Sequence, residues 1–199
     1  AREPYLVLGY KTPVAVSGQD SWELYALDMM PSILDGGSRA RFSRNLVRGS
    51  EIAVTAGAEY NAFSRLPGML LVDGTPANGH DVEQLEKGLQ SEIARLREVL
   101  VEDEELERVR AQVVAGKVYE LDSVFYQAMQ IGTLETVGLD WRLLDEYVQR
   151  IKEVTAEQVR SVARKYLIDE RLTVAVLEPL PLEEGSSPVA AAMGGGHGH

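Results

Sequence analysis

Apolar residues recur along this chain in two periods, one typical of strands and the other of helices. Short stretches of β-forming or alternating residues predict strands at 5–10, 51–60, 68–72 and 172–177. Apolar residues three or four positions apart, or a helix-start signal, predict helices at 20–34, 39–48, 82–100, 103–130, 141–151 and 155–167. The short link between the second and third strands predicts that these two strands pair antiparallel.

This order of elements predicts an α+β fold. We expect one mixed, largely antiparallel sheet of about four or more strands, with helices packed on one face. No linker interrupts residues 1–182, which we expect to form a single domain. Residues 183–199 are rich in Gly and Ala and lack periodicity, which predicts a flexible tail. The first residue is not Met, which favours a piece of a longer protein.

Composition excludes several classes of function. The 199 residues carry 20 basic and 31 acidic side chains, a formal net charge of −11. A dedicated nucleic-acid binder needs a basic surface, so we expect no nucleic-acid partner. No apolar run approaches the roughly 18 residues of a membrane span. The absence of cysteine excludes disulfides, thiolate metal sites and a cysteine nucleophile.

Histidine is also scarce, with three residues in the whole chain. His80, Glu83 and Gln84 partly match the His-x-x-Glu-His helix of zinc peptidases, but Gln84 occupies the position of the second histidine ligand. We therefore interpret His80 as a turn or capping residue. His197 and His199 are interpreted as part of the tail. We predict no catalytic residue, no metal ligand and no cofactor in this chain.

One basic segment stands out in this acidic protein. Residues 38–50 contain four arginines and no acid. Arg41, Arg44 and Arg48 are spaced i, i+3 and i+7, so they share one face of the predicted helix. Arginine binds carboxylates and carbonyl oxygens well, and we predict that these three residues bind substrate. The alternative is a solvated stripe paired with nearby acids.

Several short motifs follow one another along the chain. The first are Leu-Asp-Gly-Gly-Ser-Arg-Ala-Arg-Phe at 34–42 and Ile-Ala-Val at 52–54. Those that follow are Pro-Gly at 67–68, Glu-Leu at 105–106, Val-Thr-Ala-Glu-Gln-Val at 154–159, Lys-Tyr-Leu at 165–167 and Val-Leu-Glu-Pro at 176–179. In their order these motifs resemble the second domain of pitrilysin/insulinase-type (M16) zinc peptidases. The resemblance covers roughly residues 5 to 180 and points to the inactive, C-terminal-type domain.

In this family two similar α+β domains face each other around a peptide chamber, and one of them holds zinc in the inverted motif. The resemblance implies that this chain is the non-catalytic half, which completes the chamber and contributes to binding a peptide substrate. It further implies a catalytic partner domain, fused or separate, that supplies the zinc, and no proteolysis by this chain alone. The family favours a bacterial periplasm or cell envelope. The alternatives are a scaffold or assembly subunit of the same fold, and an unrelated anion- or peptide-binding module.

The family often holds the substrate backbone with an Arg in the helix and a Tyr in the following strand, seven residues apart. An ungapped register puts Val47 and Val54 at these two positions, so both polar members are missing. Arg48 is one residue off and fits only with a local register shift. Tyr60 has the strand parity of Val54, but at ~3.3 Å per residue it lies about 20 Å further along.

Overall fold

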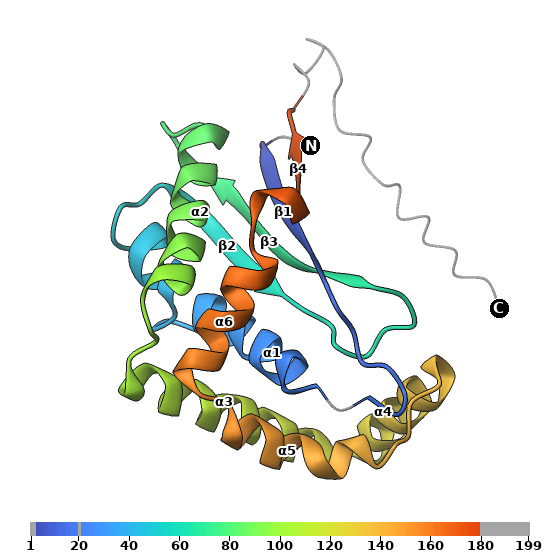
Figure 1. Cartoon of the computed structure of the whole chain (residues 1–199). Helices are drawn as coiled ribbons and strands as arrows, with labels where there is room; N and C mark the ends of the chain where they lie inside the picture. Colours follow the sequence, from blue (N-terminus) through green and yellow to red (C-terminus); the bar gives the residue numbers. More distant parts are fainter. Residues whose placement is uncertain (1–2, 20, 180–199) are drawn as a thin grey trace, which may run out of the picture.

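The computed structural model describes residues 3–19 and 21–179. Its four strands form one antiparallel sheet in the order β2-β3-β1-β4 (Figure 1). The strands are β1 (Tyr5–Thr12), β2 (Ala53–Glu59), β3 (Gly68–Pro76) and β4 (Leu172–Leu177). The helices are α1 (Trp22–Asp35), η1 (Ser43–Val47), α2 (Val82–Glu98), α3 (Asp103–Leu121), α4 (Val124–Val137), α5 (Leu143–Glu153), α6 (Ala156–Tyr166) and η2 (Asp169–Arg171). The predicted α+β class is confirmed, and so is the antiparallel pairing of β2 with β3.

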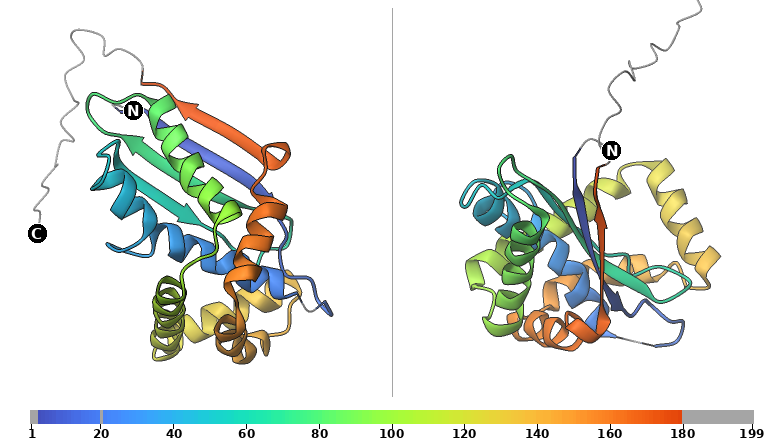
Figure 2. Two further views of the ribbon diagram at one scale, coloured as in Figure 1. Left: turned by 60° about the vertical axis from the view of Figure 1, so that its left-hand side comes forward. Right: turned by 90° about the horizontal axis from the view of Figure 1, so that it is seen from above.

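The helices cover one face of the sheet, as Figure 2 shows. Alternate residues of the central strands point toward them, and Leu6 and Leu8 of β1 and Leu70 of β3 are 0% exposed. Helices α1, α2 and α6 contact the sheet, while α3 and α5 pack on α1 in turn. The inward-facing alternate residues of the strands therefore pack against the apolar faces of the helices in one core.

Two helices begin with the capping box that their sequences encode. Asp81 accepts a hydrogen bond from the Gln84 backbone N–H at 2.8 Å, and the Gln84 side chain accepts one from the Asp81 N–H at 3.2 Å. Thr155 and Gln158 make the same reciprocal pair at the start of α6, as predicted. These contacts satisfy N–H groups that lack partners inside the helix, and so fix where α2 and α6 start.

The helix expected over 103–130 is two helices, which is a correction. The chain breaks at Asp122 and Ser123, and the Ser123 hydroxyl accepts a hydrogen bond from the Tyr126 N–H at the start of α4. Helix α4 packs chiefly on α3 and projects from the helical layer (Figure 2). Leu134 is its buried residue, whereas Phe125 is 71% exposed. No helix in the described part of the chain combines the length and apolar character needed to cross a membrane.

The helix expected over 39–48 also differs from the α-helix that the sequence suggested. The helical turns begin at Arg41, and residues 43–47 form the π-helix η1. Its hydrogen bonds join residues five apart, from the Arg48 N–H to the Ser43 oxygen at 3.1 Å and from the Ser50 N–H to the Asn45 oxygen at 2.9 Å. A π-turn is wider than an α-turn, so the angular spacing of its side chains departs from the 3.6-residue period.

The glycine pair between α1 and the basic segment is required by the backbone. A Cβ on Gly36 would lie 2.2 Å from the Ser32 carbonyl oxygen, and Gly37 has a φ of +94°.

We expect Gly36→Ala to lower the free energy of unfolding by at least about 1 kcal/mol, because the added Cβ clashes with the backbone. Gly132→Ala in α4, where nothing lies within 4 Å of the added carbon, should raise it by about 0.4–1 kcal/mol. Urea unfolding midpoints test both changes, and equal midpoints for the two variants would contradict this account.

Candidate functional site

Two contacts anchor the basic segment to the helical layer. The Arg41 guanidinium donates to both carboxylate oxygens of Glu105 on α3, from Nε at 3.1 Å and from an Nη at 2.6 Å. The Asn45 side-chain amide donates to Glu92 on α2 at 2.8 Å. Arg41 and Glu92 are 6% and 4% exposed, so one member of each contact is buried. The position of η1 on the protein is therefore fixed by partners far away in sequence.

The three predicted substrate-binding arginines do not lie on one solvent face. Arg41 points inward to Glu105, whereas Arg44 and Arg48 are exposed. The Arg44 Nε donates to the Asn45 side chain at 3.2 Å. Arg48 donates to the backbone oxygens of Ser38 and Ser43, which draws its guanidinium back over the segment. The expectation of a shared face assumed α-helical spacing, and the π-helix breaks that spacing. A role in substrate binding stays a proposal for all three.

An open cavity of about 300 Å³ lies beside the two exposed arginines. It is lined by four arginines and three glutamates, namely Arg39, Arg44, Arg48, Arg108, Glu102, Glu104 and Glu105. Glu105 is already paired with Arg41, which leaves the basic groups in excess at this surface. Such a surface offers several guanidinium N–H donors to a carboxylate or to peptide carbonyls.

The positions where the family has its Arg and Tyr are occupied by two valines, which cannot bind a peptide backbone through polar side chains. Val47 is partly buried, and Val54 is 56% exposed at an irregularity in the β2–β3 register. Tyr60 is held elsewhere, since its hydroxyl donates to the Pro13 oxygen at 2.7 Å. The π-helix supplies a local irregularity directly before Arg48, the residue that the sequence placed one position away from the family arginine.

The partial zinc motif serves the start of a helix. His80 precedes α2, and its Nδ1 lies 3.0 Å from the Gln84 side-chain oxygen. Gln84 itself completes the capping box with Asp81. Across residues 3–19 and 21–179, no three His, Cys, Asp or Glu side chains gather in a way that could hold a metal ion. His197 and His199 lie outside the described residues.

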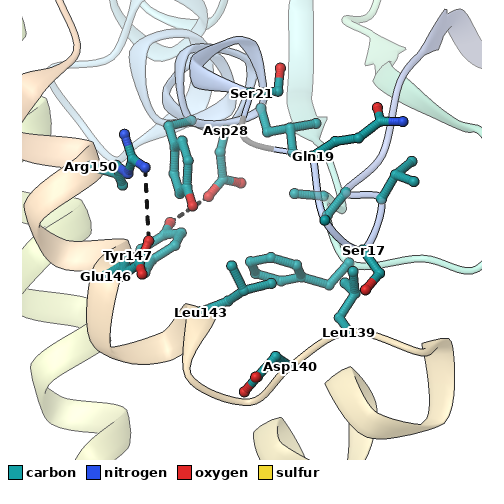
Figure 3. A pocket seen from close by; sticks show the side chains of 17 residues that line it. Ser17, Gln19, Ser21, Asp28, Leu139, Asp140, Leu143, Glu146, Tyr147 and Arg150 are labelled. Atoms are coloured by element: carbon teal, nitrogen blue, oxygen red, sulfur yellow. Dashed lines mark hydrogen bonds and ion pairs between the residues drawn. The ribbon is translucent and has the colours of Figure 1, made fainter.

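A second cavity, of about 280 Å³, was not predicted from the sequence (Figure 3). It lies among the loop after β1, the first half of α1 and the start of α5. Asp28 of α1 faces it and accepts a hydrogen bond from the Tyr147 hydroxyl of α5. One signal was visible in the sequence, because Asp28 is the one charged residue of the largely apolar stretch 24–34.

The surroundings of Asp28 oppose its ionisation. Burial raises the pKa of the Asp28 carboxyl, while the hydrogen bond from Tyr147 and the nearby Lys117 act in the opposite direction. Burial likewise raises the pKa of the Tyr147 phenol, and the neighbouring Asp28 carboxylate raises it further. The phenol therefore stays protonated and donates, which leaves Asp28 as the acceptor at the bottom of the cavity.

Comparison with solved structures finds the same fold. The chain superimposes on a protease from Helicobacter pylori with a TM-score of 0.80 and 21% identity, covering 90% of this chain and 42% of that one. An inactive peptidase domain from Bordetella parapertussis gives 0.76 and 22%, with 93% and 96% covered. A chain of complex III2 from Candida albicans gives 0.70 and 16%, with 88% and 43% covered. At these identities the similarity establishes the fold, and the chain spans less than half the length of the first and third proteins.

Comparison of sequences identifies the family. A search of curated proteins found no match. The sequence profile of the peptidase M16 inactive domain matches residues 2–113, which is more than half of the chain. The matched region contains the whole of β1, α1, η1, β2, β3 and α2, together with the Gly-Gly loop and the arginines described above. On this evidence the chain belongs to the peptidase M16 inactive-domain family.

Proposed function

We propose that this chain is the non-catalytic half of an M16-type zinc metallopeptidase, where it completes the peptide chamber and contributes to substrate binding. The observation that carries the proposal is the match to the inactive-domain family. Zinc and the catalytic water belong in this proposal to a partner domain with the His-x-x-Glu-His motif, fused or separate. The chain spans 42% of the Helicobacter pylori protease, which leaves room in such a protein for a second domain of this size.

Uncovered apolar surface supports an assembly with another domain. Helix α4 exposes Val124 and Phe125 at 82% and 71%. Strand β4 lies at the edge of the sheet, and Val174 and Val176 are 41% and 46% exposed on it. Large apolar side chains gathered on one element are typical of surfaces that another protein or domain covers.

The arginine cavity is the surface that we assign to the substrate. Arg44 and Arg48 offer N–H donors that match the carbonyl oxygens or the terminal carboxylate of a peptide. Arg41 contributes in this proposal by holding the segment in place through Glu105. Arg48 could replace the family arginine if it exchanged its bonds to the Ser38 and Ser43 carbonyls for bonds to a peptide.

Reconstitution tests the proposal. The purified chain alone should neither bind zinc stoichiometrically nor cleave peptides. Addition of a His-x-x-Glu-His M16 domain from the same source should produce zinc-dependent hydrolysis that neither protein shows separately. Zinc-dependent cleavage by this chain alone, abolished by His80→Ala, would contradict the proposal.

The role of the two exposed arginines is tested in the same reconstituted system. The Arg44→Glu/Arg48→Glu double variant should raise KM for a peptide substrate about tenfold, because each lost charge-assisted hydrogen bond contributes on the order of 1.5–3 kcal/mol and part of this is recovered from water. Lys87→Glu, at an exposed position of α2 outside the cavity, reverses one positive charge and should leave KM unchanged. Equal KM values for the two variants would remove the arginines from the binding site.

A scaffold or assembly subunit is the second candidate. Val54 in place of the family tyrosine, together with an Arg48 that is bonded to its own segment, favours this alternative. The fold is also shared with a chain of complex III2. Reconstitution separates the two, since a scaffold would associate with its partner without any gain in peptide hydrolysis.

A further inference from the structure

The cavity between α1 and α5 is closed in by apolar and aromatic walls. Leu24, Leu139 and Leu143 form part of its apolar lining, and three aromatic rings also line it together with Asp28. At about 280 Å³ it lies just below the usual range of ligand pockets, which is ~300–1,000 Å³. Its size suits one large side chain or a free molecule of similar volume.

The three rings are grouped around one another. The Tyr25 and Tyr147 ring centroids are 6.0 Å apart, and those of Phe63 and Tyr147 are 6.4 Å apart. All three rings line the cavity that Asp28 also faces. Aromatic faces carry negative electrostatic potential, and several of them around one space form the usual site for an organic ammonium. A carboxylate beside the rings adds a full negative charge to the same preference.

Acidic groups outnumber basic ones in the lining of the cavity. Three acids line it, namely Asp28, Asp140 and Glu146, and Arg150 is its one basic lining residue among those that the structure describes. Arg150 lies 3.8 Å from Glu146, and Figure 3 marks this ion pair with a dashed line of its own. Lys117 stands 5.3 Å from the centroid of the Tyr147 ring, is paired with Glu120 and does not line the cavity.

An ordinary structural role does not explain this arrangement well. A tyrosine hydroxyl between two helices needs an acceptor, and a neutral amide or a backbone oxygen would serve without the desolvation cost of a carboxylate. Asp28 is also partly accessible, and the surface that it exposes faces the cavity. A partly accessible acid beside three aromatic rings fits the charge and the apolar body of an organic cation.

We propose that this cavity binds an organic cation, an ammonium group on an apolar body no larger than one large side chain. Asp28 pairs with the ammonium, Tyr147 holds the carboxylate in place, and the rings of Tyr25 and Phe63 contact the apolar body. The site does not depend on the arginine cavity or on the proposed peptidase role. Two sources have this chemistry, a lysine side chain of a peptide and a free small amine.

The test compares benzylamine with benzyl alcohol, which has the same ring but no charge. Both are titrated into the whole chain, and binding is followed by the amide resonances of the protein. Benzylamine should bind at least tenfold more tightly and shift resonances of the loop after β1 and of the start of α5. Asp28→Asn should remove the difference between the probes, whereas Asp35→Asn, on the same helix but outside the cavity, should keep it.

Equal affinity for the two probes, absence of binding by benzylamine, or an unchanged preference in Asp28→Asn would each overturn the proposal. Val16→Trp provides a second variant, because Val16 lines the cavity but is 51% exposed, so a larger ring there can fill the space without disturbing the core. It should weaken benzylamine binding. If it leaves benzylamine affinity unchanged, the probe binds elsewhere and the proposal fails.

A second pair of probes identifies the source of the cation. The peptide acetyl-Gly-Lys-Gly-amide is compared with the same peptide carrying norleucine, which keeps the methylene chain and lacks the ammonium. Preference for the lysine peptide assigns the cavity to a peptide side chain. Preference for benzylamine with no binding of the lysine peptide assigns it to a free amine, and both results support a cation site.

Discussion

Replacing Arg41 by alanine is expected to lower the free energy of unfolding by about 3–5 kcal/mol. The Arg41 and Glu105 side chains are 8% and 14% exposed, so the substitution leaves a mostly buried Glu105 carboxylate without its partner. Removing one member of a buried ion pair therefore lowers stability by much more than the intact pair contributes to it, because the remaining charge stays buried without a partner. The same change frees η1 from α3. Urea unfolding followed by circular dichroism measures the loss.

Arg44→Ala is the matched control for this prediction. Arg44 lies in the same segment and is exposed, so its removal should change the free energy of unfolding by less than about 0.5 kcal/mol. The double variant Arg41→Met/Glu105→Leu should recover most of the loss, because both charges leave the buried position together. Similar unfolding midpoints for Arg41→Ala and Arg44→Ala would show that the Glu105 pair does not anchor the segment.

Periodic segments of the sequence predicted most of the fold. The strand expected at 172–177 coincides with β4, and the helix expected at 20–34 differs from α1 by two residues at its start and one at its end. These elements have one buried face each, and the period of the apolar residues reports that face directly. The M16 resemblance in the sequence agrees with the inactive-domain match over residues 2–113.

The elements that differed depend on contacts between distant residues. The π-helix at 43–47 is held by Arg41 with Glu105 and by Asn45 with Glu92, partners that lie 64 and 47 positions away. A local pattern contains no information on such pairs, so the sequence could suggest only an ordinary helix there. The break before α4 could have been predicted more easily from the sequence, since Ser123 is a good N-cap residue inside the expected helix.

The candidate sites also combine features that the sequence showed with features that only the structure showed. The excess of arginine in 38–50 was visible in the sequence, but the burial of Arg41 was not. The cavity at Asp28 depends on Tyr147, which lies 119 positions further along the chain. An isolated acid in an apolar helical stretch was the available signal, and it identifies Asp28 alone without the ring cluster around it. Single residues that conflict with their local pattern therefore point to sites that periodicity does not describe.

Replacing Asp28 by asparagine is expected to stabilise the protein at about pH 8, by an amount on the order of 2 kcal/mol. Bringing an ionised carboxylate into an enclosed apolar site costs several kcal/mol, while the bond from Tyr147 is stronger to a charged acceptor than to a neutral one by about 1 kcal/mol. The desolvation cost is the larger effect. Lys117 reduces it and Glu120 increases it, both from α3.

The sign of the pH dependence follows from the raised pKa of Asp28. Between the ordinary aspartate pKa of about 4 and the raised value in the folded state, the unfolded chain releases its proton first, so the native protein loses stability as pH rises through this window. Asp28→Asn lacks this loss. Its advantage should therefore be present at about pH 8 and disappear below about pH 4, as measured by urea midpoints across this range.

Asp140→Asn provides a control at the same cavity, because the pKa of Asp140 is lowered whereas that of Asp28 is raised. The Arg142 backbone N–H, 2.9 Å away, and the Arg142 side chain lower the pKa of Asp140, so this carboxylate stabilises the fold above its ordinary pKa and its removal should not help at pH 8. A gain for Asp28→Asn that persists at low pH would contradict an ionisation cost. If the gain follows pH as expected, and the same variant loses its preference for benzylamine, then Asp28 lowers stability in return for binding a cation, a trade that is common at functional sites.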